Sequence, residues 1–168
     1  MNTEFYVLTA NNESGKVIND IPLPAHFDLG CQLAAKLYRD GKRVFMFTES
    51  EQDAHLLDEH LWGFEADAFV PHNLAGEGAR NGAPVEISWQ VPANHRHVLI
   101  NFSTLVPGFF NQFKQIIDFV PHDDNGKQAA RERYKYYRQC GCQLQTHTLP
   151  QSSTINELSA GTSTTNKG

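Results

Sequence analysis

The chain has 168 residues, a length typical of one domain, and a net charge of −5 at pH 7. No apolar run approaches the roughly 20 residues that a membrane-spanning helix needs, and the first residues lack the pattern of a signal peptide. We therefore predict a cytoplasmic protein whose cysteines, Cys31, Cys140 and Cys142, are free thiols. One Cys-Gly-Cys spacing supplies too few ligands for a metal site, so we expect no metal and no cofactor.

In the first half of the chain, apolar runs alternate with amphipathic stretches, as in an α/β domain with a largely parallel sheet. We expect a strand, a loop, a helix and a strand over residues 4–9, 11–24, 27–38 and 43–48. Gly41 is placed to end this helix in a left-handed conformation. Ser50, followed three residues later by the acidic Asp53, predicts a capped helix that ends at Gly63.

The second half continues the alternation. Strands are expected over 68–70, 85–89, 97–102, 115–120 and 142–148, a short helix over 107–113, and a long helix that Asn125 caps and that ends at Gln139. The glycine-rich residues 75–82 match neither the dinucleotide nor the Walker pattern, so we expect a mobile loop there. Residues 1–149 are predicted to form one α/β domain, and the polar residues 150–168 a disordered tail.

Charge is distributed unevenly along the chain. Eight basic and seventeen acidic residues precede residue 126, whereas residues 126–139 carry five basic residues and one acid. At the helical repeat, a stripe about 100° wide is formed by Lys127, Arg131, Tyr134, Lys135 and Arg138. The stripe suits an acidic ligand, because Arg131 can hold a carboxylate bidentately and Tyr134 offers a flat wall to a ring. A solvated helix face is the alternative.

Bulky side chains gather where the second expected helix ends, at Trp62, Phe64, Phe69 and Pro71. Large exposed aromatic residues are typical anchors of protein interfaces. Packing in the core is the commoner outcome for Trp and Phe, and the local pattern taken alone favours the core.

Enzymatic chemistry is weakly supported. His95 and His97 alternate at a strand start with no carboxylate nearby in sequence, and no Ser or Cys stands in a nucleophile-elbow context. His72 and His122 each follow a proline at an expected strand end, where α/β folds often place a site. Together with Glu77 they define an alternative function, a nucleotide-processing α/β enzyme that uses its strand-end loops.

The sequence resembles the family of chi subunits of the bacterial DNA polymerase III holoenzyme. The similarity extends over about residues 4–148 and is carried by residues 69–78, 82–87, 118–121 and 127–135. The resemblance implies a Rossmann-like, three-layer α/β fold with a largely parallel open sheet and no nucleotide site. It also implies a non-catalytic adaptor that grips the acidic C-terminal tail of single-stranded-DNA-binding protein, a peptide with several Asp residues and a terminal Phe.

The resemblance places this tail site at Val120, Lys127, Arg131, Tyr134 and Lys135. It implies that Arg131 meets the terminal carboxylate, while Val120 and Tyr134 line a pocket for the ring.

A second partner is implied as well: the psi subunit, which forms a heterodimer with chi and tethers it to the clamp loader. Its contact is implied at Trp62, Phe69 and Pro71, which reverses the expectation of a core position for these aromatic residues. DNA would be contacted only indirectly. Direct binding of single-stranded DNA to the basic stripe is a further alternative, and the negative net charge disfavours it.

Overall fold

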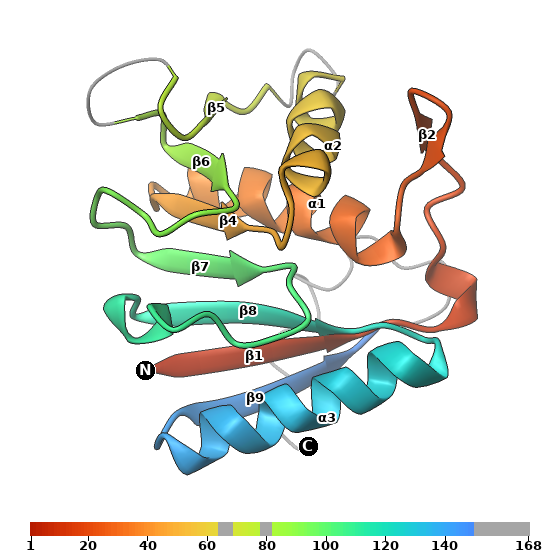
Figure 1. Ribbon diagram of the computed structural model, residues 1–168, viewed down its shortest axis with the longest axis vertical. Coiled ribbons are helices and arrows are strands. Elements are labelled where there is room, and N and C mark those ends of the chain that lie inside the picture. Colours follow the sequence, from red (N-terminus) through yellow and green to blue (C-terminus); the bar gives the residue numbers. More distant parts are fainter. Residues whose placement is uncertain (64–68, 78–81, 150–168) are drawn as a thin grey trace.

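The computed structural model describes residues 1–63, 69–77 and 82–149. In chain order the elements are β1 (Asn2–Val7), η1 (Ala10–Asn12), β2 (Val17–Ile18), β3 (Ile21–Pro22), α1 (Ala25–Arg39), β4 (Val44–Phe47), α2 (Glu51–Trp62), β5 (His72–Leu74), β6 (Val85–Ser88), β7 (Val98–Asn101), η3 (Phe110–Gln112), β8 (Gln115–Val120), α3 (Asp124–Gln139) and β9 (Gln143–Thr148) (Figure 1). Among the helices in these ranges, none is both long and apolar enough to span a bilayer.

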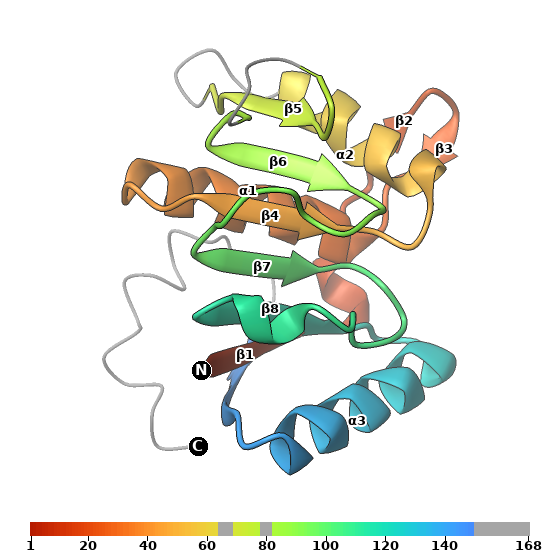
Figure 2. The ribbon, with the colours of Figure 1, turned by 60° about the vertical axis from the view of Figure 1, so that its left-hand side comes forward.

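Seven strands form one sheet in the order β5-β6-β4-β7-β8-β1-β9, and every neighbouring pair is parallel. Successive residues of a strand point to opposite sides of the sheet. Runs of consecutive buried residues, as in β4, β6 and β7, therefore place buried side chains on both faces. Val44 and Met46 pack in the cluster that contains α1 and α2, whereas Phe45 packs in the cluster that contains α3. Helices therefore cover both faces of the sheet (Figure 2), which confirms the expected three-layer α/β fold with a parallel sheet.

Several predicted local signals are confirmed. The Ser50 hydroxyl accepts a hydrogen bond from the Asp53 backbone N–H at 3.1 Å and caps α2. Gly41 follows α1 with a φ of +79°, a conformation that favours glycine. Within α1, a Cβ atom on Gly30 would lie 2.4 Å from the ring of Phe102, so this glycine allows the ring to pack against the helix.

The predicted cap of the last helix is wrong. The helix begins at Asp124, and the Asp123 carboxylate accepts a hydrogen bond from the Gly126 N–H at 2.8 Å. Asn125 lies inside the first turn, because the extended backbone that a capping residue requires occurs at Asp123. The short helix expected over 107–113 is reduced to the three-residue turn η3.

One loop prediction and one strand prediction also need correction. The segment over 11–24 contains a hairpin of β2 and β3, whose turn residues Asn19 and Asp20 both have positive φ, as a type I′ turn requires. The strand expected over 68–70 is displaced: Phe69 and Val70 are not in a strand, and β5 begins at His72. Residue 68, residues 78–81 of the predicted mobile loop and the predicted disordered tail 150–168 lie outside the described residues.

Candidate protein interaction sites

A buried ion pair fixes α3 on the sheet. Arg133 of α3 lies 3.0 Å from the carboxylate of Asp118 on β8, and both side chains are buried. The Arg133 guanidinium also donates to the carbonyl oxygens of Thr104 (2.9 Å) and Phe119 (2.8 Å), and the Tyr137 hydroxyl donates to Asp118 at 2.9 Å. Burial raises the pKa of the Asp118 carboxyl above its usual value, and the neighbouring Arg133 charge opposes that shift.

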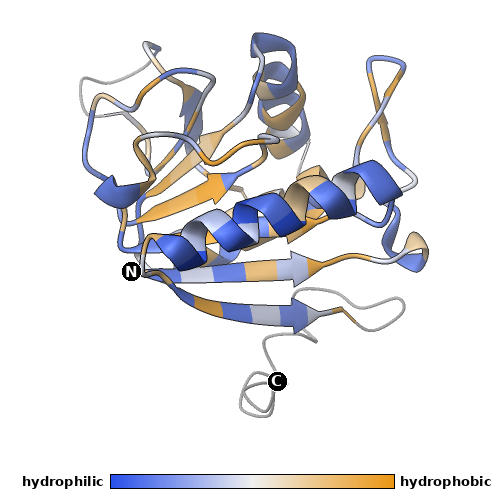
Figure 3. Cartoon of the chain, turned by 60° about the horizontal axis from the view of Figure 1, so that its bottom comes forward, coloured by the Kyte–Doolittle hydropathy of each residue, from blue (hydrophilic) through white to orange (hydrophobic). Residues whose placement is uncertain are grey.

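This anchoring turns the predicted stripe away from the core. Tyr134 is partly buried against Phe5 of β1, with ring centroids 5.4 Å apart. Arg131 and Lys135 are exposed, and Lys127 is partly exposed near the start of the helix. Figure 3 shows α3 in front of the sheet with its outward side mostly hydrophilic. The structure therefore exposes Arg131 and Lys135 on the helix that also carries the partly buried ring of Tyr134.

Val120 joins this surface from the strand beneath. It ends β8 opposite Val7 of β1, and it packs, partly buried, in the same apolar cluster as Tyr134. The cluster also contains Leu144 of β9, which the sequence reasoning did not single out. Its signal was weak, since Leu144 is one apolar residue in an otherwise polar strand. Val120 and Tyr134, the implied ring-pocket residues, thus pack against the same apolar cluster.

The aromatic residues at the end of α2 form a second surface. Trp62 is 57% exposed and Phe69 is 54% exposed, so the core position favoured by the local pattern is wrong for both. Their ring centroids are 6.1 Å apart, and the Trp62 ring also packs on buried His72 at 4.6 Å. Pro71 follows Phe69 by two residues and is partly buried, and Phe64 lies outside the described residues. We call Trp62, Phe69 and Pro71 the aromatic patch.

The two surfaces are far apart on the sheet. The aromatic patch adjoins β5, which is one edge strand, whereas α3 packs against β8 and β9, and β9 is the opposite edge strand. Because α2 and α3 also belong to different faces, the surfaces share no residue (Figure 2).

The histidines of the alternative enzymatic function do not converge. His72 opens β5 rather than following a strand, and His122 comes after the end of β8. In a parallel sheet, all strands begin at one end of the sheet and finish at the opposite end. His72 is also buried, with Nδ1 2.8 Å from the carbonyl oxygen of Val70 and Nε2 3.2 Å from Asp58. Glu77 is exposed beyond β5.

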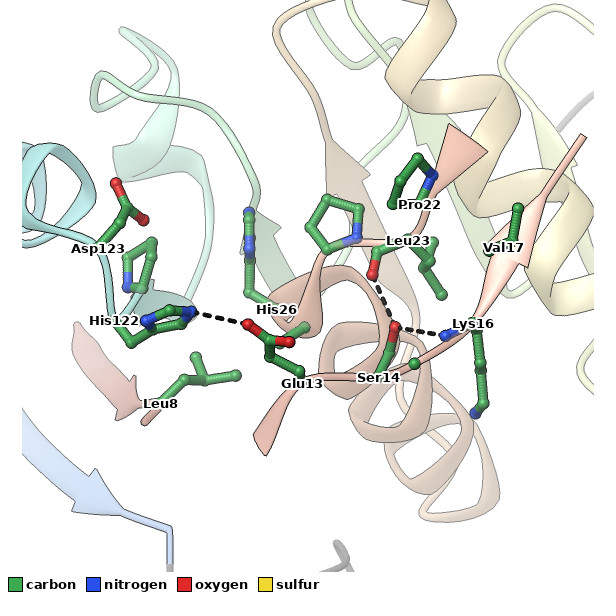
Figure 4. Close-up of a pocket in the computed structure, with 14 residues that line it drawn as sticks. Leu8, Glu13, Ser14, Lys16, Val17, Pro22, Leu23, His26, His122 and Asp123 are labelled. Carbon is green, nitrogen blue, oxygen red and sulfur yellow. Dashed lines mark hydrogen bonds and ion pairs between the residues drawn. The ribbon is translucent and has the colours of Figure 1, made fainter. Parts of the chain in front are cut away.

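A cavity of about 530 Å³ does lie beyond the ends of β1 and β8 (Figure 4). Its His122 pairs with Glu13 at 3.3 Å, and the Ser14 hydroxyl donates to the Leu23 carbonyl oxygen at 2.7 Å. Burial lowers the pKa of His26 to about 4, so this imidazole is neutral near pH 7. The Ser14 hydroxyl thus donates to a backbone carbonyl rather than to a histidine base, an arrangement that does not support nucleophilic chemistry.

Metal ligation has no candidate in the part of the chain that the structure describes: no group of three or more His, Cys, Asp or Glu side chains is placed to hold an ion. The cysteines are free, with Cys31 and Cys142 buried and Cys140 exposed.

Comparison with known proteins gives one consistent family. A family model described as "DNA polymerase III chi subunit, HolC" matches residues 1–145. The chain is 49% identical to DNA polymerase III subunit chi of Escherichia coli over 128 residues, covering 75% of this chain and 87% of the relative. It is 43% identical to the same subunit of Haemophilus influenzae, covering 87% and 96%, and 36% identical to that of Pseudomonas aeruginosa, covering 88% and 96%.

Solved structures add support for the fold alone. The C-terminal domain of the DEAD-box protein Dbp5 matches with a TM-score of 0.56 at 14% identity, covering 95% of each chain. Saccharomyces cerevisiae Dbp5 L327V bound to Nup159, Gle1 H337R, IP6 and ADP matches with a TM-score of 0.59 at 12% identity, covering all of this chain and 46% of the other. The fold is therefore Rossmann-like.

Proposed function

Because the chain belongs to the family of DNA polymerase III chi subunits, we propose that it is a non-catalytic adaptor of the DNA polymerase III holoenzyme. Its role lies in DNA replication. Through the aromatic patch it joins the psi subunit and thereby the clamp loader. Through α3 it holds the acidic C-terminal tail of single-stranded-DNA-binding protein. It contacts DNA only indirectly.

The observation that carries the tail site is the arrangement around Tyr134. Val120 and Tyr134 pack, partly buried, against one apolar cluster, and Arg131, three residues before Tyr134 on α3, is exposed. A peptide that ends in Phe presents a ring and a carboxylate a few bonds apart, which this arrangement can hold together. Lys127 and Lys135, on the same side of α3, attract the Asp residues that precede the ring.

The chemistry of the aromatic patch supports the psi contact. Two aromatic side chains, each more than half exposed, lie ring against ring on a protein with a net charge of −5. Such side chains dominate interfaces when a partner covers them. Both exposed surfaces fit a protein that connects two others, and the separation between them lets both partners bind together.

Replacing Arg131 with alanine is expected to weaken binding of the acidic tail peptide. Losing a hydrogen bond to a charged group costs about 1.5–3 kcal/mol, which is roughly a 10- to 150-fold rise in Kd. Fluorescence anisotropy with a labelled tail peptide measures it. Arg39→Ala is the matched control, because Arg39 is an exposed arginine at the end of α1 on the other face.

An equal loss in both variants would show that net charge alone drives binding. An unchanged Kd for Arg131→Ala would remove Arg131 from the site, and with it the proposed tail function of α3.

The terminal Phe of the peptide is expected to contribute affinity that salt does not screen. Burying such a ring stabilises by about 1.5–3 kcal/mol, whereas attraction to exposed Lys127 and Lys135 falls as ionic strength rises. Titration calorimetry should therefore show that added salt weakens the full peptide, and that a peptide without the Phe binds poorly even at low salt. Equal affinities of the two peptides would mean that the ring pocket at Val120 and Tyr134 is misplaced.

A further inference from the structure

A concave surface lies on the flank of α3 opposite the stripe. It is a cavity of about 460 Å³ with one wall from Leu105 and Val106, in the segment between β7 and β8, and the other from Ala129 and Tyr136 of α3. Leu105 is 75% exposed and Tyr136 is 47% exposed. We call this surface the apolar groove. Scattered apolar residues are ordinary on protein surfaces, but here two large ones line the walls of one hollow.

The wall that carries Leu105 is held firmly. The Leu105 carbonyl oxygen accepts hydrogen bonds from the Ser103 hydroxyl at 2.6 Å and from the Asn101 side chain at 3.4 Å. The Thr104 carbonyl oxygen accepts from buried Arg133, and the Thr104 N–H donates to the Glu49 carboxylate. Hydrogen bonds hold the backbone on both sides of the exposed leucine. Little backbone entropy would therefore be lost when a partner binds this side chain.

The charge at the groove is acidic. Exposed Glu132 of α3 lines it, and exposed Glu49 adjoins it through Thr104. Glu132 also lies 3.8 Å from Lys135, a pair between exposed side chains that holds its charge only weakly. Arg133 also lines the groove, but its charge is paired with Asp118 in the interior. The rim therefore has the opposite sign to the stripe on the other flank of the same helix, and it would repel an acidic peptide.

We propose that the apolar groove docks a segment of a third protein partner, in which a large apolar side chain stands next to lysine or arginine. The apolar side chain enters between Leu105 and Tyr136, and the flanking cation pairs with Glu132 and Glu49. This partner differs from the two of the proposed function, since the groove shares no residue with the aromatic patch and no predicted tail-site residue.

The test uses the full chain labelled with ¹⁵N and two synthetic hexapeptides, one with Leu-Trp flanked by lysines and one with Leu-Trp flanked by glutamates. We expect saturable NMR shifts at residues 104–106, Ala129, Glu132 and Tyr136 with the lysine peptide, and at least tenfold weaker binding of the glutamate peptide. Leu105→Asn and Glu132→Lys should each weaken the lysine peptide on the order of tenfold. Val91→Asn should not, although Val91 is a 69% exposed apolar residue, because it lies outside the groove.

Four outcomes would overturn the proposal. The lysine peptide could give no saturable shifts, or the glutamate peptide could bind as well. Leu105→Asn could convert a dimer into a monomer in sedimentation, which would make a second copy the occupant. The signals of residues 150–168 could move on Leu105→Asn, which would make the chain's own C-terminal segment the occupant. Shifts from the acidic tail peptide, read on the same sample, report on the stripe separately, so failure of one site does not imply failure of the other.

Discussion

Replacing Trp62 and Phe69 together with alanine is expected to abolish assembly with the psi subunit and to leave the affinity for the acidic tail peptide nearly unchanged. Interface anchors of this type contribute about 2 kcal/mol or more each, so the pair should cost at least roughly a thousandfold in affinity. The tail site should not respond, because distant sites that share no residue behave additively. Size-exclusion chromatography with purified psi and peptide anisotropy on the same sample measure the two effects.

The matched control replaces Val17 and Val91, two other exposed apolar residues, with alanine and should retain psi. Retention of psi by the Trp62 and Phe69 variant would place the interface elsewhere. A large drop in its melting temperature would mean that the rings stabilise the fold, as contact with His72 could allow. Loss of the tail peptide as well would show that the two surfaces are coupled.

Arg133→Ala is expected to lower the free energy of unfolding by about 3–5 kcal/mol, because it leaves the buried Asp118 carboxylate without its counter-charge. It also removes the donors to the carbonyl oxygens of Thr104 and Phe119. Urea denaturation measures the change. Arg138→Ala, an exposed arginine on the same helix, should change stability by no more than about 0.5 kcal/mol.

Adding Asp118→Asn to Arg133→Ala should recover part of the loss, since a neutral amide needs no counter-charge. If Arg133→Ala cost less than about 1 kcal/mol, water or another group would have to satisfy Asp118, and the ion pair would not be what holds α3 in place.

Features that depend on neighbours in the sequence were predictable. The apolar strands with helices between them indicated a parallel α/β sheet, and Ser50 and Gly41 marked helix ends, because each signal acts within a few residues. The period of the last helix likewise grouped Lys127, Arg131 and Tyr134 on one side, since the helical repeat determines which residues share a face.

Only the tertiary structure decided where those faces point. Periodicity sets the directions of Arg131 and Arg133 relative to each other, but the distant Asp118 on β8 determines that Arg133 turns inward. In the same way, local sequence could not show that Trp62 and Phe69 are exposed.

The remaining features arise from residues far apart in the chain. The local pattern suggested that a strand ends before His72, but β5 begins there. His72 and His122 are therefore separated, because the strands of a parallel sheet begin at one end of the sheet and finish at the other. The apolar groove exists because α3 packs beside the segment that carries Leu105. Local pattern determined the elements and their faces, whereas contacts between distant elements determined which side chains remained available to partners.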